Sequence, residues 1–164
     1  MVTATITGDC RYMSLVLSGQ QGFAQLTVRN GNFTDTINVN LPSGGATFNT
    51  VISLDSFGIK DGIFEVEMID PSGVPQYAAA LGDCALNCCI VKKMESILGC
   101  DCGCTKCNHH LITAERVNLL ILAIRTSLYQ ISNSPETNTA ILTSARKKYS
   151  KAQELCSDSC GCNC

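Results

Sequence analysis

Residues 81–90, LGDCALNCCI, mark the point at which the sequence changes its hydrophobic period. Before this stretch, short runs rich in Val, Ile, Thr and Phe are separated by clusters of Gly, Asn, Asp, Ser and Pro, a pattern typical of strands joined by turns. After it, apolar residues recur at helical spacing, as at Leu86, Ile90 and Ile97. Eleven of the twelve cysteines also follow Asp83. The sequence therefore predicts an α+β chain whose β and α parts are segregated at about residue 83.

The first part, residues 1–83, has the pattern of an antiparallel β-sandwich of immunoglobulin-like type. In Phe64-Glu-Val-Glu-Met68 the apolar side chains alternate with glutamates, so one face of this strand is expected to be buried. The part has no Trp and a single cysteine, Cys10, so it lacks the Cys–Trp–Cys signature of antibody domains and the strand order is not predicted. The expected strands are 2–7, 12–18, 23–29, 34–40, 47–54, 62–69 and 75–81.

The second part, residues 84–164, is predicted to be a cysteine-rich three-helix module. The first helix begins near Cys84 and ends at Gly99, since glycine commonly follows a helix. The second is expected from about Asn108 to about Ile131. The third follows Asn133-Ser-Pro-Glu136, which has a capping residue, a first-turn proline and a glutamate at capping-box spacing. Short connections fold such helices up-down-up, so the ends of the first and third helices share a pole.

Two cysteine clusters are expected to meet at that pole. Eight thiolates in one place fit two tetrahedral Zn²⁺ ions in closed, structural coordination, which would lock a small helical core. Gly103 and Gly161 allow the tight turns that ligation needs. The predicted zinc ligands are Cys100, Cys102, Cys104, Cys107, Cys156, Cys160, Cys162 and Cys164, with His109, His110, Cys84 and Cys88 as possible additional ligands.

Disulfides between the same clusters are the alternative, because convergence of the thiols serves both chemistries. The start of the sequence shows neither the positive nor the apolar segment of a signal peptide. We therefore expect synthesis and retention in a reducing cytosol, which favours zinc. Four cysteines also have a simpler interpretation as small buried hydrophobic residues, namely Cys10, Cys84, Cys88 and Cys89.

Charge and motifs argue against several classes of function. Residues 1–83 carry a net charge of −5 and residues 84–164 one of +3, and the basic residues are scattered, so we expect no nucleic-acid binding. No phosphate loop, nucleophile elbow or HExxH motif is present. We expect no enzymatic activity and no small-molecule substrate. The apolar run 117–124 is too short to span a membrane.

That apolar run is the expected contact surface for protein partners. Val117-Asn-Leu-Leu-Ile-Leu-Ala-Ile124 is apolar almost all round the helix, which is more than a three-helix core needs. We therefore predict association with protein partners, including copies of the same chain. The predicted interface residues are Val117, Leu119, Leu120, Ile121, Leu122 and Ile124.

In layout the chain resembles small virion-associated structural proteins of tailed bacteriophages. The resemblance is carried by the sandwich at 1–83, the cysteine-rich helices at 84–164, and the stretches Cys88-Cys-Ile-Val-Lys-Lys93 and Cys100-Asp-Cys-Gly-Cys-Thr-Lys-Cys107. It implies a non-enzymatic structural or assembly subunit in the neck, in tail or fibre attachment, or on the capsid. An extracellular disulfide-stapled binding module and a metal-handling protein are the alternatives.

Overall fold

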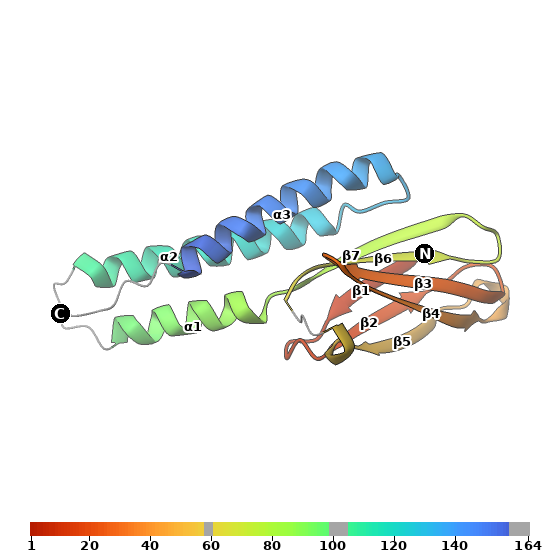
Figure 1. The fold of residues 1–164 in the computed structure, drawn as a ribbon, viewed down its shortest axis with the longest axis horizontal. Coiled ribbons are helices and arrows are strands. Elements are labelled where there is room, and N and C mark those ends of the chain that lie inside the picture. The colour runs from red at the N-terminus through yellow and green to blue at the C-terminus, as the bar shows by residue number, and fades with distance from the viewer. Residues whose placement is uncertain (58–60, 99–104, 158–164) are drawn as a thin grey trace.

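The computed structural model describes residues 1–57, 61–98 and 105–157, with the side chains of residues 56 and 105–107 left aside (Figure 1). Strands come first and helices follow, so the predicted α+β class is confirmed. The strands are β1 (Val2–Ile6), β2 (Tyr12–Leu17), β3 (Gly22–Asn30), β4 (Phe33–Leu41), β5 (Phe48–Ser53), β6 (Gly62–Ile69) and β7 (Pro75–Gly82). The helices are α1 (Cys84–Leu98), α2 (Thr105–Leu128) and α3 (Pro135–Ser157), and short 3₁₀ turns lie at Ser43–Gly45 and Asp55–Phe57.

The strands form two antiparallel sheets packed face to face. One sheet has the order β1-β2-β5 and the other β4-β3-β6-β7. In the larger sheet Val28 lies opposite Val66 and Leu26 opposite Met68, which aligns their apolar faces. The fourth strand pairs with β3, whereas in the constant-type immunoglobulin sandwich the fourth strand joins the sheet of the first. The architecture is thus sandwich-like, with its own strand order.

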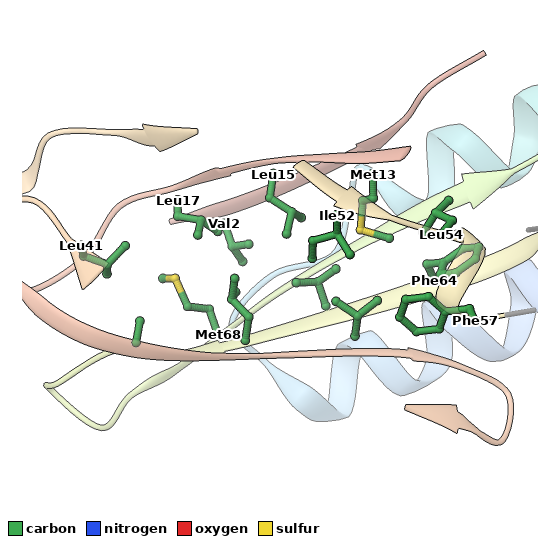
Figure 2. Packing of buried hydrophobic residues seen from close by; sticks show 14 residues of the cluster. Val2, Met13, Leu15, Leu17, Leu41, Ile52, Leu54, Phe57, Phe64 and Met68 are labelled. Carbon is green, nitrogen blue, oxygen red and sulfur yellow. The ribbon is translucent and has the colours of Figure 1, made fainter. Parts of the chain in front are cut away.

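The core of the sandwich lies between the two sheets, as Figure 2 shows. Phe64, Val66 and Met68 of β6 are fully buried, while Glu65 and Glu67 lie on the opposite face of the strand, as the alternation predicts. Phe57 and Phe64 meet edge to face with ring centroids 5.8 Å apart. The core residues labelled in Figure 2 are Val2, Met13, Leu15, Leu17, Leu41, Ile52, Leu54, Phe57, Phe64 and Met68.

A second core joins the helices to the outer face of the β6–β7 edge. Ile63 and Leu81 are buried from the sheet side, and Val117, Ile121 and Ile124 of α2 are buried in the same cluster. Figure 1 shows that α1 follows directly from the end of β7. The C-terminal half of α2 and the start of α3 lie beside the sheet (Figure 1). The helical part is therefore packed on the sandwich through apolar side chains on both sides of residue 83.

Local signals explain where the helices begin. The carbonyl of Asp83 accepts the N–H of Asn87 at 2.8 Å, and Asp61 Oδ1 accepts the N–H of Ala85 at 2.8 Å. Carboxylates at this end of α1 also complement the helix dipole. The α3 helix begins at Pro135, and the carbonyl of Ser134 accepts the N–H of Asn138. Ser134 therefore stands at the start of α3, one residue later than the predicted cap at 133.

Candidate docking surface and cysteine sites

Cys10 and Cys84 form a disulfide between the sandwich and the first residue of α1. Cys10 lies in the turn between β1 and β2, and its Cα atom is 6.2 Å from that of Cys84. The bond closes a ring across 74 positions of sequence, and closure of a loop of this size is worth about 4 kcal/mol in the chain-entropy account. Cys84 was expected as a possible metal ligand and Cys10 as a small buried hydrophobe. The structure instead pairs them covalently, although Cys10 is indeed buried.

A second disulfide joins Cys89 of α1 to Cys156 in the last turn of α3. Their Cα atoms are 5.7 Å apart. Cys156 was predicted as a zinc ligand, and this bond occupies its sulfur. Cys88 was predicted either as a possible metal ligand beside Cys84 or as a small buried residue. It is instead exposed, and it has no disulfide partner among the cysteines that the structure describes, while Cys84 is bonded to Cys10. Within the helical part, the bonded cysteines whose side chains are described thus form a disulfide, as the alternative to zinc predicts.

The other predicted zinc ligands cannot be placed. Cys107 lies in the first turn of α2, with its side chain outside the described residues. The remaining members of the two clusters, Cys100, Cys102, Cys104, Cys160, Cys162 and Cys164, lie outside them altogether.

His109 and His110, predicted as possible ligands, occupy opposite environments on α2. His109 is exposed. His110 is 1% exposed, and neither of its ring nitrogens has a hydrogen-bond partner among the residues that the structure describes. Burial lowers the pKa of His110, and the charges of Lys93 and His109 lower it further. The imidazole of His110 is therefore held in its neutral form inside the helical core.

The inner face of α2 accounts for four of the six predicted interface residues. Val117, Ile121 and Ile124 are almost completely buried in the core that the helices share with β6 and β7. Leu120 is half-buried against the same cluster. These four side chains serve the fold of the chain itself, so a partner can reach only Leu119 and Leu122 of the predicted set.

The outer face of α2 carries a second apolar surface, which we call the outer stripe. Leu119 is 64% exposed, Leu122 49% and Tyr129 90%. At 100° per residue, Leu119 and Leu122 lie on the side of α2 opposite the buried face, and Tyr129 directly follows Leu128, the last residue of the helix. The outer stripe consists of Leu111, Ile112, Leu119, Leu122 and Tyr129, all of which are exposed.

The spacing of the outer stripe follows a heptad pattern. Positions 112, 119 and 126 repeat every seven residues, and so do positions 115, 122 and 129, giving alternate steps of three and four. The two positions that are not apolar are Glu115 and Thr126. Such spacing is that of a coiled-coil seam, in which one helix packs along another.

Two ion pairs tie the second and third helices to the rest of the chain. Arg125 forms an ion pair with the buried carboxylate of Asp83 at the start of α1. Arg146 of α3 pairs with Glu65 of β6 at 2.6 Å. These pairs hold α2 and α3 in register with the sheet edge, so the outer stripe is presented on a fixed support.

Within the described ranges, no helix has the length and apolar character needed to cross a membrane. Comparison of the chain with models of known protein families, with curated proteins and with solved structures finds no match in any of the three.

Proposed function

We propose that this chain is a non-enzymatic structural subunit that self-associates through the outer stripe of α2 and takes its place in a larger protein assembly. The observation that carries the proposal is the second apolar face of α2. Leu119, Leu122 and Tyr129 are left in water by the fold of a single chain, and burying each leucine would contribute roughly 1.5–3 kcal/mol.

A second copy of α2 fits the stripe best when it runs antiparallel. In that arrangement Leu119 of one copy faces Leu122 of the other, and Ile112 faces Tyr129. Glu115 then lies beside Arg125 of the second copy, which gives opposite charges at the edge of the seam. A parallel pair would instead place two Glu115 carboxylates side by side, which is unfavourable.

Sedimentation and light scattering test the self-association. We expect the wild-type chain to be a dimer, and the double variant Leu119→Glu, Leu122→Glu to be a monomer with an unchanged circular dichroism spectrum. Phe23→Glu is the matched control, because Phe23 is 76% exposed on the sandwich and lies away from α2. A wild-type monomer at all concentrations, or a double variant that associates like the wild type, would contradict the proposal.

The orientation has its own test in Glu115→Arg. In the antiparallel pair this substitution places two arginines side by side, so the dimer should weaken measurably at low salt. In a parallel pair the substitution replaces a contact between two Glu115 carboxylates with a contact between two arginines at position 115. Both contacts are repulsive, so the dimer affinity should be nearly unchanged.

The proposal includes bound Zn²⁺ and a place in a virion. Seven cysteines of the two predicted clusters remain for metal once Cys156 is bonded to Cys89. The proposed location in a tailed-bacteriophage virion is supported only by the resemblance in layout. Native mass spectrometry with and without chelator counts bound zinc, disulfides and subunits together, and the absence of zinc would remove this part of the proposal.

The two disulfides favour a second candidate, an extracellular disulfide-stapled binding module. Thiol titration under denaturing conditions separates the candidates. Seven or more free thiols support the zinc-containing subunit, and one or none supports the extracellular module.

A further inference from the structure

Three groups able to bind a metal meet where the sandwich joins the helices. They come from Cys10 in the β1–β2 turn, Asp61 just before β6, and Cys84 at the start of α1. Their ligand atoms all lie within 4.8 Å of one another. We propose that this junction is a redox-dependent clamp, which is a disulfide when oxidised and a Zn²⁺ site of Cys10, Cys84 and Asp61 when reduced.

The geometry suits both states of the clamp. The Cα atoms of Cys10 and Cys84 are 6.2 Å apart, a separation that side-chain rotation can use either to bond two sulfurs or to place them round one ion. Donor atoms on a tetrahedral zinc lie about 3.3–3.8 Å apart, as ligand distances of 2.0–2.3 Å require. Once the S–S bond is reduced, the two sulfurs have to separate to that distance, and the ligand oxygen of Asp61, which lies within 4.8 Å of both, has to approach them by about 1 Å.

The surroundings favour anionic ligands at this point. Cys84 is the first residue of α1, where the helix dipole stabilises a thiolate. Oδ1 of Asp61 accepts the N–H of Ala85 at 2.8 Å, which fixes the carboxylate and leaves Oδ2 for an ion. The Asn30 side chain donates to the carbonyl of Asp61 at 3.0 Å and anchors the backbone on the other side. The carboxylate is thus oriented before any metal arrives.

The conversion balances with a dithiol as the reductant. The dithiol transfers two electrons and two protons to the Cys10–Cys84 bond and becomes a disulfide itself. Binding of Zn²⁺ then releases the two thiol protons to solvent and forms two Zn–S bonds and one Zn–O bond. Three protein ligands leave the fourth tetrahedral position to water. The junction is consequently held by a cross-link in an oxidising environment and by a metal in a reducing one.

Site-resolved alkylation tests the clamp in the full chain. The protein is reduced with a dithiol, desalted without oxygen, and treated with iodoacetamide, either without Zn²⁺ or with enough Zn²⁺ to saturate the proposed sites at the cysteine clusters as well. The alkylation rate at Cys84 is measured by peptide mass spectrometry. We expect zinc to slow alkylation of Cys84 by about tenfold or more. Reading one cysteine separates this site from zinc bound elsewhere in the chain.

Two variants make the test specific. Asp61→Asn keeps an oxygen for the Ala85 N–H and should still form the oxidised disulfide, but it should lose most of the protection by zinc. Cys10→Ser should lose the protection as well, and Cys88→Ser, a neighbouring free thiol, should keep it. Equal alkylation of Cys84 with and without zinc, or full protection in Asp61→Asn, would overturn the proposal.

Discussion

His110 is a buried imidazole without a hydrogen-bond partner in the described part of the chain, an arrangement that costs stability. We expect His110→Leu to raise the free energy of unfolding by about 1–3 kcal/mol, because the leucine fills the same space without an unsatisfied polar atom. Urea unfolding at neutral pH measures the effect. Lower stability in the variant would show that the imidazole has a partner in solution.

The same residue gives a pH dependence with a definite sign. The folded-state pKa of His110 lies below its ordinary value of 6.5, so folding favours the neutral ring. This contribution is complete above pH 6.5 and is lost as pH falls from there towards the folded-state value. The fall in stability between pH 7.5 and pH 5.5 should be smaller in His110→Leu than in the wild type. His109→Leu removes only the smallest of the three causes that lower the pKa of His110, so it should leave most of this fall in place.

At the scale of the element, the Cys89–Cys156 bond ties the first helix to the end of the third. Cys89→Ser should lower the free energy of unfolding by about 2–4 kcal/mol, since the unfolded chain loses a cross-link over 67 positions. Hydrogen exchange should quicken most in α1 and in the last turns of α3, and it should also quicken in β2 and β3, because the two parts of the chain share a core and unfold together. Cys88→Ser is the adjacent control, and equal exchange in the two variants would contradict the expectation.

The strands were predictable to within one residue at each end, because turn residues mark most of the connections between them. Gly73 shows the signal at its clearest, with a φ of 77° in the turn before β7. The second helix was less well predicted, since it begins and ends three residues earlier than expected. Its apolar residues lie on two opposite faces, so the pattern does not mark which residues the fold will bury.

The cysteine pairs were beyond prediction from spacing. Sequence favoured zinc through clusters of near neighbours, whereas Cys10 and Cys84 are 74 positions apart and meet only because β7 ends beside the β1–β2 turn. Asp61 is not part of any sequence motif either. It lies near Cys10 and Cys84 only because the fold brings the start of β6 to the same place. Tyr129 was not predicted, because it lies five residues after the end of the apolar run 117–124.

At the scale of the whole molecule, the shared core makes the sandwich and the helices depend on each other. Leu81 is buried between β7 and the helices, so Leu81→Ala should cost about 2–5 kcal/mol and lower the stability of both parts equally. Hydrogen exchange at increasing denaturant concentrations measures the free energy of unfolding of the sandwich and of the helices separately. Leu41→Ala, in the sandwich core, should also lower both. Separate unfolding of the helices would contradict a common transition.

The Cys10–Cys84 bond also decides how the molecule would carry tension. A pull between β1 and the helices passes from Cys10 through the sulfur bridge to Cys84, without entering the 73 residues that the ring encloses. Strands β2 to β7 are thereby shielded from load while the bridge is intact. A single backbone cut inside the ring would likewise leave both fragments attached. If such a subunit transmitted force within an assembly, the Cys10–Cys84 junction would bear the load and the strands of the sandwich would not.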